Sequence, residues 1–214
     1  YNMLQQPLQA IPIYESLLAL EEERQDRAGQ WRALYGLGFS QKTNGAPAQA
    51  VPYIQRALEL ARGLDDQSLA LAALQELEAD YAALAEYAEV ARYSEEIVQL
   101  ARALGDRGLV AEKLATSGYA YEQQGNFQRA AAQYQAALGT YRDVNDVRGE
   151  WRALDDLGRL AVKQDDTTEA VIRYQDAFKV AQRAGLRAGQ VSALEHTAAA
   201  YRSAKDYEKA TQYY

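Results

Sequence analysis

The chain repeats itself every forty residues, and this period limits the folds open to it more than any other feature of the sequence. An aspartate and, eight positions later, a leucine recur at this spacing: Asp26, Asp66, Asp106 and Asp146, then Leu34, Leu74, Leu114, Leu154 and Leu194. Small residues keep the same register at Gly38, Gly118, Gly158 and Ala198. A fixed period of roughly 20 to 50 residues is typical of solenoids, propellers and other repeat arrays. We therefore expect a series of similar units.

Each half of the forty-residue unit has the hydrophobic spacing of an α-helix. Apolar residues recur at intervals of three and four, as in Trp31, Leu34 and Leu37, which places them on one helical face. Gly, Asn and Asp interrupt the pattern between the halves, at 44–45, 104–106, 125–126, 145–146 and 165–166. Gly and Asn tolerate the left-handed backbone that ends a helix, and Asp accepts hydrogen bonds from free amides at the next helix start. The sequence predicts antiparallel helix pairs, each helix about 18 residues and about 27 Å long.

A second pattern within the repeat resembles the tetratricopeptide repeat, and residues 106–145 carry it most fully. The matching residues are Leu114, Gly118 and Tyr121 in the first helix, and Ala130, Tyr134 and Ala137 in the second. The repeats at 26–65 and 146–185 share much of this pattern. The repeat at 66–105 departs from it, because Glu78 stands where a small residue belongs and Ser94 where an aromatic residue belongs.

The resemblance implies an all-α fold, a right-handed superhelical solenoid of antiparallel helix pairs. The family's common period is about 34 residues, so the forty-residue period is similar to the longer subclass of kinesin light chains, polarity adaptors and bacterial regulators. We expect one array over residues 1–214. Its units would be approximately 1–25 (partial), 26–65, 66–105, 106–145, 146–185 and 186–214 (partial). Because the last amphipathic pattern breaks off after about two turns, we expect a fragment of a longer protein. The sequence leaves open whether a signal peptide lies upstream.

Composition excludes several classes of function. The 23 basic and 30 acidic residues give a net charge of -7, which argues against nucleic acid, since phosphate binding relies on clustered Lys and Arg. The absence of Cys excludes disulfides and thiolate metal sites. No apolar run approaches eighteen residues, so we expect no membrane insertion. The composition points weakly to a bacterial cytoplasm.

The residues that catalysis requires are scarce. His196 is the one histidine, and a single imidazole without cysteine supplies little metal-binding or nucleophilic chemistry. Adjacent carboxylates such as those of Asp155 and Asp156 diverge by about 100 degrees on a helix and do not form a dyad. The segment 36–38 has two glycines but lacks the third glycine of a dinucleotide site. We expect no catalytic, cofactor or metal site and no enzyme activity.

The resemblance implies that the first helix of each pair lines the concave side of the solenoid, where partners bind. Non-core residues of these helices are the predicted partner-binding residues: Arg32, Tyr35, Phe39, Lys42, Gln75, Glu112, Tyr119, Glu122, Gln123, Arg152, Asp155, Arg159, Lys163, Glu195 and Arg202. Phe39 and Tyr119 are large apolar groups that the stack does not need, and binding surfaces expose such groups. A solvated face of an ordinary amphipathic helix is the alternative for any one of these residues.

Two features leave the ligand class open. Related long-period proteins often place Asn two residues before the small position, where this chain has Gly36, Glu76, Thr116, Asp156 and His196. No Lys and Asn set typical of a carboxylate clamp is present.

The two halves of the chain differ in charge. Residues 1–105 carry 8 basic and 15 acidic side chains, whereas 106–214 carry 15 of each. The acidic excess attracts a basic partner or serves solubility alone.

Three functions are open from the sequence. The first is a non-enzymatic scaffold that binds another protein or a peptide segment in the concave groove. The second is a regulatory module of a larger enzyme or signalling protein, such as a caspase-like protease or an ATPase regulator. The third is self-association through the truncated ends, because an incomplete repeat leaves an apolar face uncovered.

Overall fold

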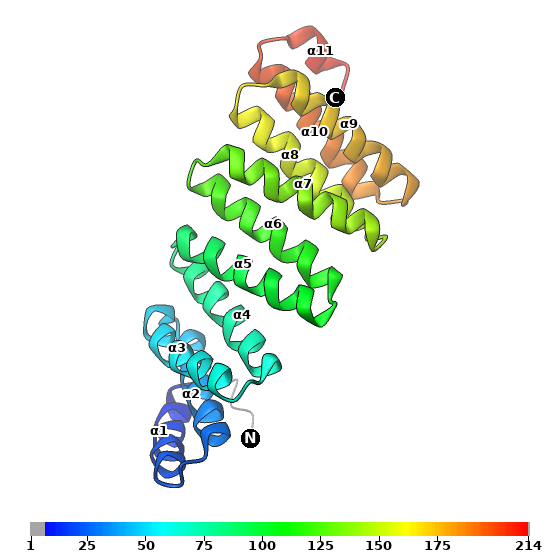
Figure 1. Ribbon diagram of the computed structural model, residues 1–214. Helices are drawn as coiled ribbons and strands as arrows, with labels where there is room; N and C mark the ends of the chain where they lie inside the picture. Colours follow the sequence, from blue (N-terminus) through cyan, green and yellow to red (C-terminus); the bar gives the residue numbers. More distant parts are fainter. Residues whose placement is uncertain (1–6, 214) are drawn as a thin grey trace. The chain divides into compact units, whose positions relative to one another are not determined.

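The computed structural model describes residues 7–213, and this part of the chain is helical without any strand. Figure 1 shows the helices in chain order. Their bounds are α1 (Pro7–Glu23), α2 (Arg27–Thr43), α3 (Pro47–Gly63), α4 (Gln67–Ala83), α5 (Tyr87–Leu104), α6 (Arg107–Gln123), α7 (Phe127–Asp143), α8 (Val147–Lys163), α9 (Thr167–Arg183), α10 (Arg187–Ser203) and α11 (Tyr207–Thr211). The helices start every twenty residues, which is half the sequence period.

The twenty-residue step comes from a turn that is repeated at every junction. In each turn one residue has a positive φ: Gln25, Gly45, Asp65, Ala85, Gly105, Gly125, Asn145, Asp165, Gly185 and Lys205. In the first turn the amide of Asp26 donates to Glu21 O and that of Gln25 to Glu22 O, the bond pair of a Schellman motif. The residue that completes this motif also caps the next helix, so one short segment ends a helix and starts another.

The predicted helix caps are confirmed at most of these junctions. The side chain of Asp26 accepts from the amide of Gly29, and Asp106, Asp146 and Asp166 act in the same way. Ala46 and Leu186 form no side-chain cap. After Ala46 a proline follows at the first helical position, where its missing amide leaves no donor unsatisfied.

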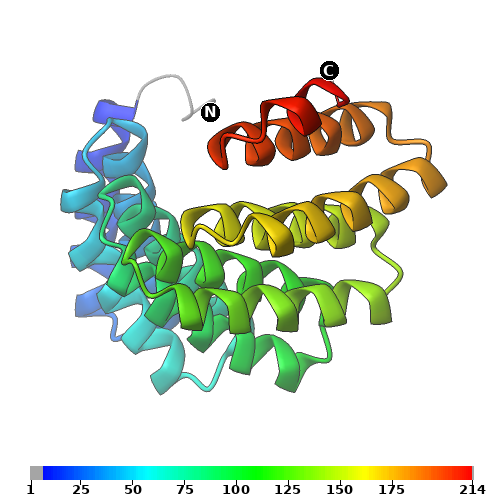
Figure 2. The same cartoon turned by 90° about the horizontal axis from the view of Figure 1, so that it is seen from above.

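The chain divides into two compact units, residues 1–100 (unit 1) and 101–214 (unit 2). In unit 1, α1 packs on α2, α2 on α3 and α3 on α4. In unit 2, each helix from α6 to α11 packs on the next, and neighbours run in opposite directions (Figure 2). Helix α8 also contacts α6 and α10. We call α2, α4, α6, α8 and α10 the A helices and the others the B helices.

Glycines on the A helices let a large side chain of the following B helix approach the backbone. A Cβ placed at Gly118 would lie 2.7 Å from Tyr134 Cδ1, and one at Gly158 would lie 2.5 Å from Tyr174 Cε1. Such distances are too short for any side chain in a close-packed interior. These glycines and tyrosines therefore serve the packing of the helix pairs.

The repeat at 66–105 has neither the glycine nor the tyrosine of this contact, and Glu78 and Ser94 stand at their positions. Glu78 and Ser94 are buried, and Ser94 Oγ donates a hydrogen bond of 2.5 Å to Glu78 Oε1. A large residue on the A helix and a small one on the B helix thus fill the space that glycine and tyrosine fill in the repeats at 106–145 and 146–185. The hydrogen bond satisfies two polar groups that burial would otherwise destabilise.

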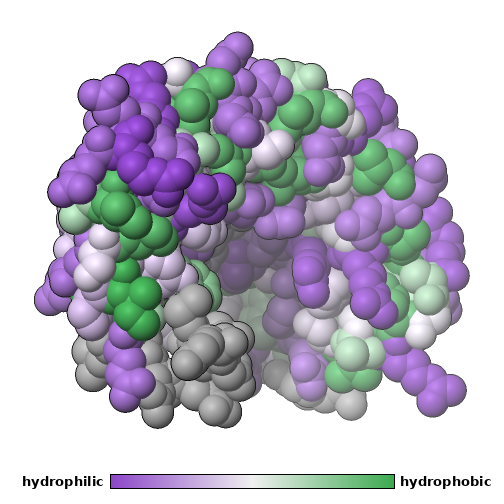
Figure 3. All heavy atoms as spheres, turned by 90° about the horizontal axis from the view of Figure 1, so that it is seen from below, coloured by the Kyte–Doolittle hydropathy of each residue, from purple (hydrophilic) through white to green (hydrophobic). Residues whose placement is uncertain are grey.

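The surface carries apolar groups singly among polar ones. Figure 3 shows one face, on which hydrophilic side chains predominate and hydrophobic ones form separate patches. The predicted exposure of Phe39 and Tyr119 is confirmed, with 41% of each residue's surface accessible. Among the described residues, no helix has the length and apolar character that crossing a membrane requires.

Candidate functional site

The predicted partner-binding residues all lie on A helices, and each unit is described separately. In unit 1, α2 carries Arg32, Tyr35, Phe39 and Lys42, and α4 carries Gln75. In unit 2, α6 carries Glu112, Tyr119, Glu122 and Gln123, α8 carries Arg152, Asp155, Arg159 and Lys163, and α10 carries Glu195 and Arg202. Some of these side chains meet in ionic clusters and others lie exposed.

The first cluster joins α2 to α4, and we call Tyr35, Lys42, Glu76 and Asp80 the unit 1 cluster. Lys42 Nζ donates to Glu76 Oε1 at 2.8 Å and lies 3.9 Å from Asp80 Oδ1. The second distance is too long for a hydrogen bond. One ammonium therefore stands between two carboxylates.

Asp80 is the least ordinary group of the unit 1 cluster. Its accessible surface is 0%, and neither carboxylate oxygen has a hydrogen-bond partner. Burial, with a smaller contribution from the charge of Glu76, raises the pKa of Asp80 to about 6 against the opposing attraction of Lys42. Burial, Glu76 and Asp80 likewise raise the pKa of Tyr35. The sequence offered no reason to select Asp80, because core positions are expected to be apolar.

The other unit 1 residues sit beside this cluster. Tyr35 stacks on Trp31 with 4.8 Å between ring centroids, so it is partly core. Arg32 is exposed, with Nη2 3.9 Å from Asp26 Oδ2. Gln75 is half-buried and Phe39 is exposed. Phe39 therefore presents the large apolar group of this face.

The second cluster joins α6, α7 and α8, and we call Glu122, Tyr134, Asp156, Arg159 and Lys163 the unit 2 cluster. Three donors converge on the Glu122 carboxylate: Tyr134 Oη at 2.8 Å, Arg159 Nη2 at 3.0 Å and Lys163 Nζ at 2.8 Å. Burial acts against ionisation, but hydrogen bonds from Lys163 and Tyr134 give a net lowering of the pKa of Glu122. The prediction of Glu122 as a surface contact is wrong, because the carboxylate is buried and its hydrogen bonds are made inside the protein.

Two neighbouring carboxylates extend this arrangement. Arg159 Nη2 donates to Asp156 Oδ1 at 2.8 Å, and burial raises the pKa of Asp156 to about 6. Asp155 Oδ1 lies 2.6 Å from His196 Nδ1 on α10, a hydrogen bond that raises the pKa of His196. Asp155 and Asp156 thus have different partners, as their divergence on the helix predicts. The polar contacts of His196, Tyr134 and Asp156 were not predicted from the sequence, because most of them arise only between helices.

The remaining predicted residues of unit 2 are exposed. They are Glu112, Tyr119, Gln123, Arg152, Glu195 and Arg202. Glu112 pairs with Lys113 at 3.1 Å. Besides Tyr119, the A helices of this unit expose Val147 and Val191. Charges of both signs accompany them, while the clustered charges are engaged with one another.

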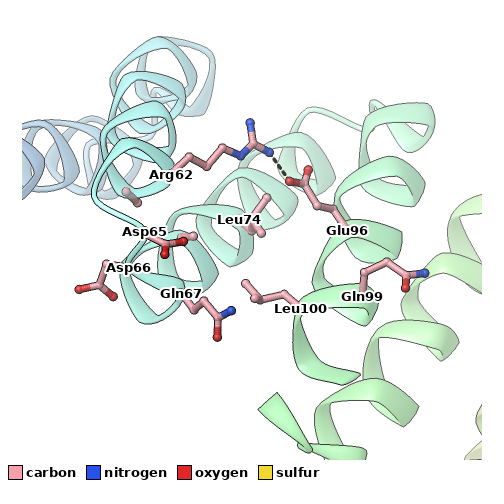
Figure 4. A pocket seen from close by; sticks show the side chains of 10 residues that line it. Arg62, Asp65, Asp66, Gln67, Leu74, Glu96, Gln99 and Leu100 are labelled. Carbon is pink, nitrogen blue, oxygen red and sulfur yellow. Dashed lines mark hydrogen bonds and ion pairs between the residues drawn. The ribbon is translucent and has the colours of Figure 1, made fainter. Parts of the chain in front are cut away.

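A cavity of about 410 Å³ in unit 1 is a second candidate site (Figure 4). Leu74 and Leu100 line it together with the ion pair of Arg62 and Glu96, which point toward each other. Polar groups complete its lining at Asp65, Asp66, Gln67 and Gln99. A cavity at the same register in unit 2 is lined by Arg102, Gly105, Arg107, Val110, Thr140 and Asp143. Because the cavity recurs, it follows from the repeat and does not indicate a particular ligand.

The described residues contain no group of three or more His, Cys, Asp or Glu side chains that could hold a metal ion. The charged clusters instead combine acids with bases in internal ion pairs. Such pairs orient helices relative to one another.

Comparisons with known proteins agree with this architecture. The family profile described as tetratricopeptide repeat matches residues 115–148. No curated protein sequence matches the chain.

Solved structures resemble the chain over most of its length. The apo form of RapI has a TM-score of 0.80 at 11% identity, with 94% of this chain and 56% of that chain covered. A signal transduction ATPase with numerous domains (STAND) from Pyrococcus horikoshii, which has a tetratricopeptide repeat sensor, has a TM-score of 0.74 at 16% identity, covering 98% of this chain and 34% of that chain. The nearly identical repeats of a kinesin light chain from Podosopora anserina have a TM-score of 0.68 at 17% identity, with 85% of this chain and 90% of that chain covered.

These identities are low, so the likenesses concern the fold. The chain spans about a third of the STAND protein and about half of RapI. The helix pairs, the matched repeat and the structural likenesses together support the predicted resemblance, and the described residues have an all-α fold of antiparallel helix pairs like that of tetratricopeptide repeat proteins.

Proposed function

We propose that the chain is a non-enzymatic module that binds a segment of a partner protein on the faces of its A helices. The fold is typical of protein-interaction scaffolds. The observation that carries the proposal is the pair Phe39 and Tyr119, which occupy the same register two repeats apart and are equally exposed. Aromatic groups exposed at a fixed register supply the large contact area on which interfaces rely.

The charged residues around these aromatics favour a protein segment over a small molecule. Arg32 lies on the exposed surface of α2, and Arg152 and Glu112 do so on α8 and α6. An extended segment makes several such contacts in succession along one unit, as helical repeat surfaces allow. Charged groups at the edge of an interface chiefly set its orientation and its association rate.

Selection of displayed random twelve-residue peptides on the immobilised chain would test the proposal. The affinity of a selected peptide is then measured for Phe39→Ala and Tyr119→Ala. Matched controls are Ile13→Ala on α1 and Ile172→Ala on α9, because both isoleucines are exposed on B helices. We expect a loss of about tenfold or more from at least one aromatic variant and less than twofold from the controls. Unchanged affinity in both aromatic variants would contradict the A-helix face.

A regulatory module within a longer protein is the second candidate. The likeness to a protein whose title names a tetratricopeptide repeat sensor supports it, since this chain aligns with only 34% of that protein. In that case the bound segment belongs to another domain of the same protein. Adding the full-length protein's other domains in trans and measuring their affinity for the chain distinguishes this arrangement from an adaptor.

A further inference from the structure

We propose that the unit 1 cluster binds a lysine or arginine side chain of the partner segment. This inference rests on the proposed function and specifies the chemistry of the partner. The charged groups of the cluster are two carboxylates and one ammonium, and the carboxylate of Asp80 receives no hydrogen bond from Lys42, Tyr35 or any other group among the described residues. A carboxylate offers about four acceptor positions, so the cluster lacks donors, and a guanidinium or ammonium supplies them.

The fold itself does not require a carboxylate at position 80. The same register holds Ser40, Ala120, Leu160 and Ala200, and all four are buried. Neutral residues therefore fill this place in every other A helix. A buried carboxylate without hydrogen bonds destabilises a scaffold, and residues that lower stability are often kept for function.

The cluster is reachable from the surface through Lys42 and Glu76. The side chain of Lys42 is 31% exposed and that of Glu76 is 13% exposed. Ala79 and Ala83 follow Glu76 at three and seven residues on α4, which places them on the same helical face. Glu76 is the carboxylate that a ligand reaches directly, because Asp80 is fully buried behind Lys42. Phe39, one turn before Lys42, offers apolar contact for the aliphatic part of a long basic side chain.

The charge of the whole unit favours the same partner. Residues 1–100 carry 7 basic and 15 acidic side chains, a net charge of -8, whereas residues 101–214 carry 16 and 15. A field of one sign concentrates ligands of the other sign and speeds their association. The acidic excess therefore lies in the unit whose cluster lacks donors.

Binding would redistribute the hydrogen bonds of the cluster without any covalent step. The incoming cation donates to Glu76, which now receives Lys42 Nζ at 2.8 Å. Lys42 then turns toward Asp80 Oδ1, from 3.9 Å to the roughly 2.8 Å of a charge-assisted hydrogen bond. Both carboxylates are satisfied in the complex, so the cation gains more than one ion pair at an exposed site would give.

Peptide selection provides the test. Displayed random twelve-residue peptides are selected in parallel on the wild-type chain, on Glu76→Gln/Asp80→Asn and on Glu15→Gln/Glu59→Gln. The last variant is the matched control, because it removes two exposed carboxylates from B helices of the same unit. Sequencing of the selected peptides gives the frequency of Lys and Arg at each position relative to the unselected library.

We expect Lys or Arg to be enriched at least fivefold at one position on the wild type and on the control, and this enrichment to be lost on Glu76→Gln/Asp80→Asn. A peptide selected on the wild type should bind the single variant Glu76→Gln about tenfold more weakly, which keeps the test valid if the double variant folds poorly. Selected peptides without a basic position, or equal enrichment on all three chains, would overturn the inference. If such peptides still lose affinity for Phe39→Ala, the proposed function stands; if no peptide is enriched, both fail.

Discussion

The unit 1 and unit 2 clusters occupy equivalent places in the repeat, but their central residues, Lys42 and Glu122, have opposite charges. Lys42 and Glu122 lie eighty residues apart at the same register, and each meets charges from the next A helix. Lys42 stands between two carboxylates, while Glu122 receives two cations and a tyrosine hydroxyl. The repeat therefore determines which positions meet, and the side chains determine the sign of the cluster and whether its hydrogen bonds are complete.

Removing the carboxylate of Glu122, the central residue of the unit 2 cluster, should lower the stability of the chain more than any other change described below. Glu122→Ala leaves Arg159 and Lys163 without their shared acceptor, so we expect the free energy of unfolding to fall by about 3 kcal/mol. Urea denaturation followed by circular dichroism measures the change. The exposed Glu112→Ala serves as the control and should change stability by less than about 0.5 kcal/mol. A loss no larger than that of the control would show that the unit 2 cluster does not stabilise its unit.

The comparison between the units can be sharpened by replacing Glu78 and Ser94 of the repeat at 66–105 with the glycine and tyrosine that stand at these positions in unit 2. Ser94→Tyr alone overpacks the space beside Glu78 and should destabilise by about 2 to 3 kcal/mol. Adding Glu78→Gly restores the pattern of Gly118 and Tyr134, so the double variant should recover most of this loss. The same denaturation experiment gives the coupling between the two changes, and additive losses would contradict the exchange.

Replacing the carboxylate of Asp80 should stabilise the chain. Its folded pKa of about 6 exceeds the ordinary value of 3.8, so the folded state binds more protons than the unfolded one between these values, and stability falls as the pH rises through that window. Asp80→Asn removes this loss and should raise the free energy of unfolding at pH 7 by about 1 to 3 kcal/mol. Near pH 4 the gain should vanish. Destabilisation at pH 7 would mean that Asp80 supports the scaffold.

The histidine of unit 2 should give the smallest effect. The pKa of His196 is raised above 6.5, mainly by its hydrogen bond to Asp155. The stabilisation is fully present below 6.5 and is lost as the pH rises through the folded pKa. Because the imidazole is partly exposed, solvent screening keeps the contribution to about 0.5 kcal/mol. A titration of His196 followed by NMR should give a pKa above 6.5, and a lower value would contradict the contact.

The helix pairs could be predicted from the sequence because their signals are local. The apolar spacing and the aspartates that precede each helix specify where helices begin, and Asp26 and Asp166 cap helices as expected. Some turns were not identified from the sequence, because non-glycine residues such as Gln25 and Ala85 adopt the positive φ there. A single array over all 214 residues stays a prediction.

The site was harder to predict, because its contacts join residues 34 to 41 positions apart on consecutive A helices. The pairs Lys42 with Glu76 and Glu122 with Arg159 depend on how those helices pack. Helical periodicity within one helix does not specify that packing. For the same reason Glu122 was taken for a surface residue, while the buried charge of Asp80 gave no signal of its own.

NMR chemical-shift mapping with a selected peptide tests the proposed function most directly. Partner binding on the A-helix face of unit 1 predicts that saturating peptide shifts the amide signals of α2 and α4 around Phe39, Lys42 and Glu76. The B helices α1 and α3 should shift little. Shifts confined to the B helices or to the turns would contradict binding on the A-helix face.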